Sequence, residues 1–554
     1  MTINLKNMTP SNPLKRIAQL VNVHKKEVVS IYLFSMLSGL INLSLPLGVQ
    51  TIIGLVMGAT MVSSIYVLIF LVVLGVFLVG LLQINQMKII ETIQQRVFAN
   101  YAYTFADTIP RMDLKKMDHY FIPEKVNRFF DTINIQKGFA KLLLDIPIAS
   151  VQIIFGILLL SLYHPLFILL GIFLLILLGI IFNLTSKRGI STSIEESNYK
   201  YEVVGFFNEM GRTLKSFKFS QGSDLNLEKT NAHTRGYLEA RTQHFHVLLF
   251  QYKTLIFFKV SLTVLMLTLG TYLLIDQQLN IGEFIAAEIV ILMVIGAVEK
   301  LITSLDSAYD VITGLEKIAS VTESPLEKSG TMELNIQKGL DIQLSNFTFS
   351  FDASKKILDS INLHIKPGQK VSINGPEGSG KSILLRMLTG NYQDFEGSFQ
   401  LNHFPIQNYA LQDLRKHTGV VLHGQEIFGG SLWENISLGQ KEITADLILQ
   451  KSMELGFDDF LSHFPAGFDT IIEPIGKKTP QTIIRKVLLL RALCGPKKLL
   501  LLEEPWAGLE TKNKEQLKHY LLNLPADTTV IVVSDDADFN RLTDQQIYMR
   551  HGKI

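Results

Sequence analysis

Six stretches of about 20 residues, rich in apolar side chains and poor in charge, follow one another between Met1 and about Ser320. A helix needs about 20 consecutive apolar residues to cross a bilayer. Because lipid offers no hydrogen bonds to an open backbone, each stretch that crosses must be helical. Core helices of a large soluble protein are the alternative, but six stretches of membrane length rarely occur together in one. The sequence therefore predicts six transmembrane helices, at Val28–Gly48, Val62–Gln83, Leu143–Tyr163, Leu166–Leu184, Leu255–Ile275 and Phe284–Leu301.

The composition of the whole chain agrees with a membrane protein and excludes other classes. Of its 554 residues, 47% are hydrophobic and only 18% are charged, against about 25% charged residues in typical soluble proteins. The 52 Lys and Arg residues nearly balance the 50 Asp and Glu residues, for a formal net charge of +2. This charge is too small to favour nucleic-acid binding, so no nucleic-acid partner is expected. The single cysteine, Cys494, excludes an internal disulfide framework and a cysteine-rich metal site.

Lys and Arg are distributed unevenly among the segments between the predicted helices. Neither occurs in the loops after the first, third and fifth helices, which are Thr51–Met61, His164–Pro165 and Asp276–Glu283. The chain before the first helix and the long segments after the second and fourth helices contain many of both. Since positively charged segments stay on the cytoplasmic side, we expect both termini and the two long segments to be cytoplasmic. The chain is thus predicted to be a multi-pass protein of the plasma (cytoplasmic) membrane, in contact with lipid.

The two long cytoplasmic segments each have about 60 residues and contain few Gly or Pro residues. Solvated loops are one interpretation. Helical hairpins are the interpretation that we favour, and each arm would then project about 40 Å at 1.5 Å per residue. Turns are expected at the tips, near Met117–Phe121 in the first segment and Phe206–Lys218 in the second.

After about Leu340 the pattern changes to short β-branched stretches with turns, which is typical of a mixed α/β domain. One predicted strand, Lys370–Asn374, leads directly into a G-x-x-x-x-G-K-S loop. In such a loop the glycines let backbone N–H groups surround a phosphate, the lysine supplies positive charge, and the serine hydroxyl binds Mg²⁺. The motif also occurs by chance, but here a strand precedes it and a predicted helix, Ile383–Thr389, follows it. The predicted nucleotide-binding residues of the loop are Gly375, Pro376, Glu377, Gly378, Ser379, Gly380, Lys381 and Ser382.

A second strand, which ends in two acids, lies about 120 residues further along the chain. Leu499–Leu502 has the pattern of a buried parallel strand, and Glu503 and Glu504 follow it. A fold with a phosphate-binding loop places its metal-binding and water-activating acids at such a strand end. We therefore expect Ser382 and Glu503 to hold Mg²⁺ and Glu504 to act as the catalytic general base. Two solvated acids at the end of a surface strand are the alternative.

Six predicted spans followed by this domain resemble the half-transporters of the ATP-binding cassette (ABC) exporter family, over nearly the whole chain. Asn346–Phe351 is similar to the family's strand whose aromatic ring, here Phe351, stacks on adenine. The resemblance implies a six-helix all-α transmembrane domain at residues 1–322 with long cytoplasmic arms, a linker at 323–338, and an α/β P-loop ATP-binding cassette domain at 339–554. Other segments similar to family motifs are Asp413–Arg415, Ile427–Leu432, Asn435–Ile436, Gly467–Thr470, Arg491–Leu493 and Glu503–Glu510.

The resemblance also implies ATP and Mg²⁺ as ligands and a dimer as the working unit. In this family each ATP lies between the phosphate loop of one subunit and the signature segment of the other. The partner would be a second copy of this chain or a different half-transporter, and the sequence does not identify the exported substrate. Asp145-Ile146-Pro147 and Pro46, in the third and first spans, are similar to elements of bacterial exporters for peptide or protein secretion.

Several positions depart from the family's motifs. The glutamine that senses the metal and the attacking water is His423 here, and the switch histidine is Asp535. An aspartate at the switch position must turn away from phosphate, bind a cation or take a proton, because like charges repel. The signature Leu-Ser-Gly-Gly-Gln is Thr479–Ile483 here. In it, Thr479 is expected to cap a helix whose first residue is Pro480.

Two functions agree with these features. The first, which we favour, is a subunit of an ATP-dependent exporter in which Mg-ATP closes two cassettes and the arms switch the spans between inward and outward access. Its activity as an ABC-type ATPase would be slow or dependent on a partner. The second is a non-catalytic ATP-binding membrane subunit that regulates or scaffolds a partner. The intact phosphate loop and Glu504 favour the first function, and Asp535 and Thr479–Ile483 favour the second. A kinase is not indicated, because the sequence lacks a kinase catalytic-loop pattern.

Overall fold

The computed structural model of this chain describes residues 13–58, 63–118, 121–219, 223–334, 338–352 and 355–554. The chain forms two compact units. The first, called here the membrane unit, comprises Met1–Pro110 and Tyr120–Ser324, and the second, the cassette unit, comprises Arg111–His119 and Pro325–Ile554. A short piece of the first cytoplasmic segment therefore packs with the cassette unit.

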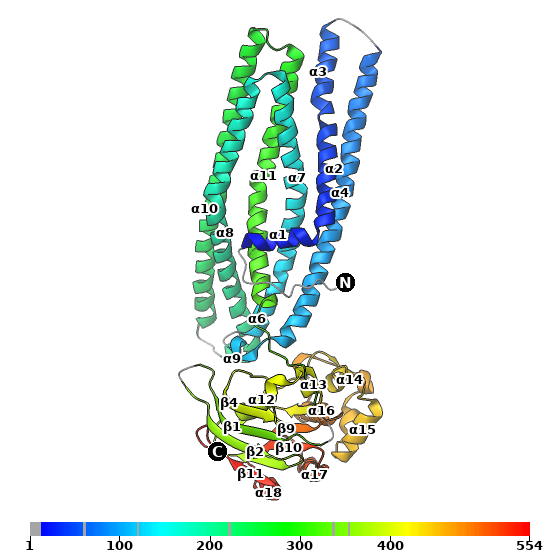
Figure 1. The fold of residues 1–554 in the computed structure, drawn as a ribbon, viewed down its shortest axis with the longest axis vertical. Helices are drawn as coiled ribbons and strands as arrows, with labels where there is room; N and C mark the ends of the chain where they lie inside the picture. The colour runs from blue at the N-terminus through cyan, green and yellow to red at the C-terminus, as the bar shows by residue number, and fades with distance from the viewer. Residues whose placement is uncertain (1–12, 59–62, 119–120, 220–222, 335–337, 353–354) are drawn as a thin grey trace. The chain divides into compact units, whose positions relative to one another are not determined.

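Six helical stretches among the described residues are long and apolar enough to cross a membrane, which confirms the predicted six-span domain. All belong to the membrane unit, where the long helices lie side by side (Figure 1). A short helix before the first span, α1 (Pro13–Val23), lies crosswise to them (Figure 1). The long helices are α2 (Lys25–Asn42), α3 (Ser44–Met57), α4 (Ser64–Thr108), α7 (Asp131–Tyr163), α8 (Leu166–Arg212), α10 (Leu225–Ile275) and α11 (Ile281–Thr322).

The first predicted span is divided into α2 and α3 at Leu43. The ring of Pro46 prevents a helical hydrogen bond to the carbonyl four positions earlier, and that carbonyl belongs to Asn42, the last residue of α2. Helical bonding resumes where the Leu47 N–H donates to the Leu43 carbonyl at 3.3 Å. One proline thus explains why this span consists of two helices.

The predicted cytoplasmic arms are continuous extensions of the spans. α4 continues about 25 residues past Gln83 and α10 begins about 30 residues before Leu255, or about 40 Å at 1.5 Å per residue. In the second segment α8 continues to Arg212, inside the predicted tip Phe206–Lys218, and the short helix α9 (Leu214–Phe219) follows. The break between α8 and α9, at Thr213, thus lies within the predicted tip, and residues 220–222, between α9 and α10, lie outside the described residues.

The predicted tip of the first segment, Met117–Phe121, includes residues 119 and 120, which lie outside the described residues. The short helices α5 (Leu114–Met117) and α6 (Ile122–Val126) lie on either side of it. The Asp113 side chain caps α5 by accepting from the N–H groups of its second and third residues, at 3.1 and 3.3 Å. An acidic cap is the expected partner for the free N–H groups at a helix start.

Small residues allow α7 and α11 to approach each other closely. A Cβ added at Gly138 of α7 would lie 2.6 Å from the Val311 side chain of α11, and one at Gly314 of α11 would lie 2.9 Å from Ile135 of α7. Close packing at small residues is the usual way in which helices associate in lipid.

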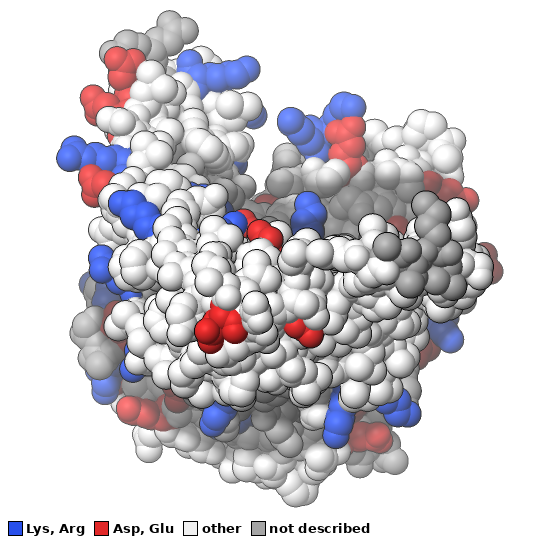
Figure 2. Space-filling model, turned by 90° about the horizontal axis from the view of Figure 1, so that it is seen from above, with Lys and Arg blue, Asp and Glu red and all other residues white. Residues whose placement is uncertain are grey.

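Seen from the end with the loops after the first, third and fifth spans, most of the visible surface is uncharged (Figure 2).

The cassette unit is an α/β domain, as predicted. A five-stranded parallel sheet has the order β11-β3-β10-β9-β6, and a four-stranded antiparallel sheet has the order β2-β1-β4-β5. All five residues of β9 are buried, as expected for a strand covered on both faces. The strands are β1 (Ile342–Phe349), β2 (Leu358–Ile365), β3 (Lys370–Asn374), β4 (Glu396–Leu401), β5 (Phe404–Pro405), β6 (Thr418–Val421), β7 (Gly430–Ser431), β8 (Ile471–Ile472), β9 (Leu499–Glu503), β10 (Thr529–Val533) and β11 (Gln545–Tyr548).

Helices cover the parallel sheet and are joined to its strands by short loops. α12 begins at the phosphate loop, and α16 begins within the signature segment. The helices of the cassette are α12 (Lys381–Leu388), α13 (Leu411–Lys416), α14 (Leu432–Ser437), α15 (Ala445–Glu454), α16 (Gln481–Leu493), α17 (Thr511–Leu522) and α18 (Ala537–Leu542).

Candidate nucleotide-binding site

The parallel sheet brings the phosphate loop and the acid pair to the same edge. β10 lies between β3 and β9, and its last residue, Val533, pairs with Ile373 of β3 and with Glu503 of β9. The carboxyl ends of the three strands therefore coincide. This edge is where open α/β sheets bind ligands.

The loop between β3 and α12 has a backbone conformation that depends on glycine. Gly375, Gly378 and Gly380 have φ angles of 139°, 74° and 102°, which residues with a Cβ rarely adopt. A Cβ at Gly375 would also lie 2.1 Å from the carbonyl oxygen of Met549. The hydroxyl of Ser379 is buried and has no hydrogen-bond partner within the described part of the chain. The loop can therefore offer both this hydroxyl and turned backbone N–H groups to a phosphate.

Lys381 and Ser382 begin α12, so both lie at the positive end of a helix. The Lys381 ammonium donates to the carbonyl oxygens of Gly375 and Pro376, the second at 3.0 Å. It thus lies within the loop, where the outer phosphates of a nucleotide would meet it. Glu377, the remaining predicted residue of the loop, is exposed.

Ser382 and Glu503, the two predicted metal ligands, are in direct contact. The Ser382 hydroxyl donates to Oε1 of Glu503, and the backbone N–H of His423 donates to Oε2 at 2.7 Å. Mg²⁺ prefers oxygen ligands and is commonly held by one or two protein groups together with substrate phosphates. No group of three or more His, Cys, Asp or Glu able to hold a metal occurs in the described ranges. These two oxygen donors fit Mg²⁺ bound together with a nucleotide.

Glu504 follows β9 in a left-handed conformation, with a φ of 41° that is uncommon for a residue with a side chain. Its N–H donates to the Val533 carbonyl at 2.9 Å, and its own carbonyl accepts from the Arg485 guanidinium at 2.6 Å. Its carboxylate accepts from the Asp535 N–H at 3.2 Å and from the Ser534 hydroxyl at 3.4 Å. Hydrogen bonds on both its backbone and its side chain therefore fix this residue at the sheet edge.

The surroundings of Glu504 change its acidity. Burial is the main cause that raises the pKa of Glu504, and the negative charge of Asp535 adds to it. The hydrogen bonds from Asp535 and Ser534 and the charge of Arg485 oppose this shift. A carboxylate whose pKa is raised is a stronger base, which suits a group that takes a proton from water. Arg485 lies in α16, outside the segments that are similar to family motifs.

Phe351, the predicted adenine-stacking residue, belongs to an aromatic group. Its ring is half-buried and contacts Phe349 and Tyr392 edge to face, with centroids 5.1 and 5.6 Å away. Lys115, from the cytoplasmic segment that packs with this unit, lies 5.2 Å from the Phe349 ring centroid. Its ammonium also donates to the Asp394 carboxylate at 2.9 Å. The cytoplasmic segment thus contacts the cassette beside the ring that would hold the base.

The water-sensing position, where the family has a glutamine, is held by His423, and its side chain does not contact Glu503. The His423 side chain is exposed, and only its backbone contacts Glu503. Gln425, the nearest glutamine, accepts from the Leu422 N–H at 3.2 Å and so completes the local turn. Asp535 is exposed and reaches Glu504 only through its backbone N–H. The outward position of Asp535 is one of the three outcomes that the sequence allowed.

The signature segment starts its helix one residue later than predicted. α16 begins at Gln481, and Pro480 lies before it with a ψ of 142°. The prediction of Thr479 as the cap and Pro480 as the first helical residue is therefore wrong, because the extended ψ removes Pro480 from the helix. The Pro480 carbonyl accepts from the N–H groups of Ile483 and Ile484 at 2.9 and 3.0 Å. The chain still presents a helix start, without the small residues of the family signature.

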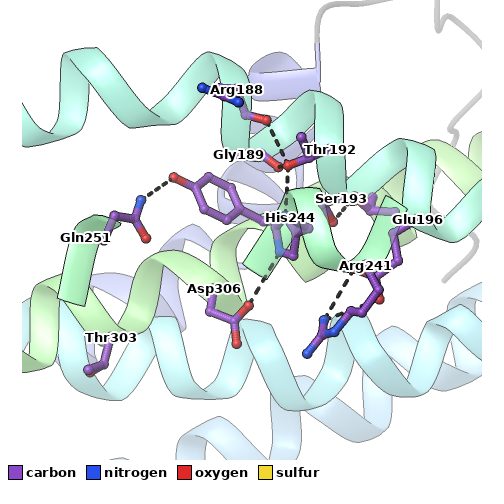
Figure 3. Close-up of polar contacts among 12 residues, drawn as sticks. Arg188, Gly189, Thr192, Ser193, Glu196, Arg241, His244, Gln251, Thr303 and Asp306 are labelled. Atoms are coloured by element: carbon purple, nitrogen blue, oxygen red, sulfur yellow. Dashed lines mark hydrogen bonds and ion pairs between the residues drawn. The ribbon is translucent and has the colours of Figure 1, made fainter. Parts of the chain in front are cut away.

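The membrane unit contains a separate polar cluster where α8, α10 and α11 meet (Figure 3). His244 of α10 is 1% exposed. Its Nδ1 lies 2.9 Å from the Thr192 hydroxyl of α8, and its Nε2 lies 3.8 Å from the Asp306 carboxylate of α11. Gln251 of α10 donates to the Tyr309 hydroxyl of α11 at 2.8 Å. These contacts fasten the α8–α10 pair to α11.

No sequence motif marks this cluster, because its members lie on three helices at separations without a local pattern. The same is true of Lys259 in the fifth span, whose ammonium pairs with the Glu299 carboxylate of α11 at 2.6 Å. Within a membrane, ionisable residues usually face the bundle and pair with one another. That expectation predicts a partner for Lys259 but not which residue it is.

Comparison with known proteins identifies two regions of this chain. A model of the ABC transporter transmembrane region matches residues 28–298, and a model named ABC transporter matches residues 358–507. In overall fold the chain is similar to a bacterial Atm1-family ABC exporter with ATP bound, with a TM-score of 0.86 and 16% identity over 96% of this chain and 95% of that one. At this identity the likeness concerns the fold alone.

Curated relatives match about half of the chain. The pediocin PA-1 transport/processing ATP-binding protein PedD of Pediococcus acidilactici is 27% identical over 53% of this chain and 41% of its own length. The alpha-hemolysin translocation ATP-binding protein HlyB of Escherichia coli is 27% identical over 53% and 42%. An ATP-dependent lipid A-core flippase of Xylella fastidiosa is 26% identical over 53% and 50%. The chain spans about half the length of the curated relatives it matches.

Proposed function

Because this chain belongs to the ABC transporter family, we propose that it is one subunit of an ATP-dependent exporter of the plasma membrane. It is a multi-pass membrane protein with a cytoplasmic cassette. The proposed division is a transmembrane domain at residues 1–322, a linker at 323–338 and a nucleotide-binding domain at 339–554. The observation that supports the proposal most strongly is the contact of Ser382 with Glu503 at the positive end of α12, directly after a complete phosphate loop.

The residues of the phosphate loop would bind the nucleotide in three ways. Lys381 supplies positive charge to the outer phosphates, and turned backbone from Gly375 to Gly380 supplies N–H donors. The Phe351 ring offers a face for the adenine beside Tyr392. Mg²⁺, when bound, neutralises phosphate charge, and Ser382 and Glu503 are the groups that would hold it.

Hydrolysis would use Glu504 as the base toward water. Its raised pKa, caused mainly by burial, favours proton uptake, and its hydrogen bonds with Asp535 and Ser534 hold the carboxylate in place. The side chains that would orient water and stabilise the transferred charge differ from the family pattern at His423, Asp535 and Thr479–Ile483. We therefore propose slow hydrolysis, or hydrolysis that depends on a partner.

Two subunits would form the transporter, because each ATP site of this family needs the signature segment of a second subunit. A homodimer would repeat the altered signature at both sites. A heterodimer with a conventional half-transporter would supply an unaltered signature to Lys381 of this chain. The names of relatives at the same level of identity refer to a pediocin, a hemolysin and a lipid A-core flippase, so the proposal names no substrate class.

A non-catalytic ATP-binding subunit is the second candidate. The exposed side chains of His423 and Asp535 favour it, because neither supplies a donor to the reacting phosphate from within this chain. In that case ATP would stabilise the dimer, and turnover would be absent with any partner.

The test is to measure ATP turnover of the purified full-length chain alone and together with any half-transporter that co-purifies, with cross-linking in native membranes to detect the dimer. Slow turnover alone and faster turnover with the partner would support the exporter. Binding of ATP without turnover in either sample would support the second candidate. Detection of monomers only, with ATP present, would contradict both assemblies.

A further inference from the structure

A cavity of about 90 Å³ lies in the membrane unit between α1, α4 and α11. One wall is polar and carries Arg16, Gln19 and His24, which belong to α1 and the turn that follows it. α11 and its cap contribute the apolar side chains Leu315, Ile318 and Ala319 and the polar side chains Thr322 and Glu323. Residues of α4, namely Val97, Asn100, Tyr101 and Thr104, also line the cavity. The cavity could hold several water molecules or a polar group of several heavy atoms.

Three buried polar atoms of this wall have no hydrogen-bond partner among the residues that the structure describes. They are Nε of Arg16, Oε1 of Gln19 and Nε2 of His24. Arg16 is 9% exposed and His24 is 3% exposed. Leaving a buried donor or acceptor unpaired destabilises a fold, and three such atoms gathered at one cavity point to a bound polar group.

The charges around the cavity indicate the nature of that group. The Arg16 guanidinium pairs with the Glu316 carboxylate and, at 3.0 Å, with that of Glu323. Burial lowers the pKa of His24, so its ring is neutral at pH 7. Two carboxylates therefore face one cation, which disfavours a group that is only anionic. A ligand that offers an acceptor to Arg16 and a cationic donor to Gln19 and Glu323 would give hydrogen-bond partners to these groups.

The position of α1 indicates where such a ligand comes from. α1 lies crosswise to the long helices and directly precedes the first span (Figure 1). An amphipathic helix in this position lies at the membrane surface. By the distribution of Lys and Arg this is the cytoplasmic surface. The apolar residues Leu20 and Val23 of α1 also line the cavity. The cavity therefore lies at the depth of the lipid headgroups.

We propose that this cavity binds the headgroup of a phospholipid with a primary amine, such as phosphatidylethanolamine, from the cytoplasmic leaflet. Arg16 Nε and His24 Nε2 donate to the phosphate, and Gln19 Oε1 and the Glu323 carboxylate accept from the ammonium. The apolar side chains Leu315 and Ile318 of α11 contact the glycerol and the first acyl carbons. The site is separate from the cassette, so its existence does not depend on ATP hydrolysis.

The test uses the full-length chain in nanodiscs of dioleoyl-phosphatidylglycerol mixed with equal parts of dioleoyl-phosphatidylethanolamine or dioleoyl-phosphatidylcholine. Lipids retained after transfer to detergent are counted by native mass spectrometry. We expect one tightly held phosphatidylethanolamine per chain, retained about fivefold more than phosphatidylglycerol. Phosphatidylcholine should be retained less, because its quaternary ammonium cannot donate a hydrogen bond to Gln19.

Two variants remove the site in different ways. Gln19→Leu deletes the acceptor, and Ala319→Leu extends a buried lining residue into the cavity. Each should reduce phosphatidylethanolamine retention to the level of phosphatidylcholine. Gln243→Leu, the same exchange at an exposed position of α10, is the matched control and should leave retention unchanged.

Equal retention of the three lipids, or unchanged retention in both Gln19→Leu and Ala319→Leu, would overturn the proposal and leave the cavity to water. A preference for phosphatidylglycerol would contradict the charge argument. Thermal stabilisation of the chain by soluble phosphoethanolamine, without any preference among lipids, would assign the cavity to a soluble compound and overturn the lipid source.

Discussion

The two sides of the nucleotide site differ in how much of their chemistry this chain supplies. On the phosphate-loop side, β3, α12 and β9 bring together Lys381, Ser382 and Glu503, which contact the loop or each other. On the side where water would attack, Glu504 is held firmly, but His423 and Asp535 reach the acids only through their backbone N–H groups. The first side depends on backbone geometry and a few charges, whereas the second depends on particular side chains.

This difference teaches that binding and turnover can be separated within one fold. A sheet edge, a glycine loop and a helix start are enough to hold phosphate. Hydrolysis needs in addition donors placed around the charge that develops in the transition state. Changing residues on one side should therefore alter the affinity for ATP, and changing residues on the other should alter the rate.

The largest effect is expected from restoring the family residues on the water side. Asp535→His, combined with replacement of Thr479–Ile483 by Leu-Ser-Gly-Gly-Gln, should raise turnover at saturating Mg-ATP by about a hundredfold or more, since each positioned donor is worth that order in rate. The affinity for ATP should change little. Asp446→His, at an exposed position of α15, is the control. An unchanged rate would show that the altered positions do not limit the cycle.

Removal of the ammonium on the phosphate side should mainly affect binding. Lys381→Ala should weaken Mg-ATP binding at least about tenfold, a loss of about 1.4 kcal/mol. The measurement is equilibrium binding of a fluorescent ATP analogue, with Lys512→Ala, an exposed lysine of α17, as the control. Unchanged affinity in Lys381→Ala would show that the loop has only a structural role and would contradict the claim that it binds the phosphates of ATP.

Removal of the adenine platform should have a smaller effect on the same quantity. Phe351→Ala should weaken ATP binding about three- to tenfold, because an aromatic stack is worth about 0.5–1.5 kcal/mol. Phe404→Ala, which removes an exposed ring from β5, should not alter it. Comparing ATP with inorganic tripolyphosphate, which has no base, separates base stacking from phosphate contacts. If Phe351→Ala and Phe404→Ala had equal affinities, Phe351 would not face the base.

The smallest effect concerns pH. Because burial raises the pKa of Glu504, the base is protonated at a higher pH than an ordinary glutamate, and turnover should fall as the pH is lowered through that value. Arg485→Gln removes a cation that opposes this shift, so the acidic limb of the rate profile should move to higher pH. Arg541→Gln, at an exposed position of α18, should leave it in place. A limb that moves to lower pH in Arg485→Gln would contradict the assignment of Glu504 as the base.

Contiguous patterns made much of the fold predictable. The six apolar stretches predicted the spans. The loop Gly375–Ser382 and the strand that ends at Glu503 predicted that loop and acids meet, because parallel strands of one sheet bring their carboxyl ends to the same edge. The exact start of α16 was not predicted, since both Pro480 at a cap and Pro480 at the first turn satisfy the same local rules.

Contacts between distant segments that carry no motif were not predictable from the sequence. Arg485 lies on a helix with no motif at that position, and only the fold brings its guanidinium to the Glu504 carbonyl. His244 and Asp306 likewise meet across two helices. Such pairs depend on how helices rotate and pack. Apolar periodicity shows which face of a helix is buried, but not which residues of a neighbouring helix it meets.

The most direct test of the account compares the unmodified chain with Glu504→Gln in one experiment, in which bound nucleotide and phosphate release are measured on the same nanodisc sample at saturating Mg-ATP. The account predicts that both proteins hold ATP to the same extent and that the unmodified chain alone releases phosphate only slightly faster than Glu504→Gln. Turnover by the unmodified chain alone at an ordinary enzymatic rate, on the order of 10 s⁻¹, and its loss in Glu504→Gln would contradict the claim that the water side limits this site.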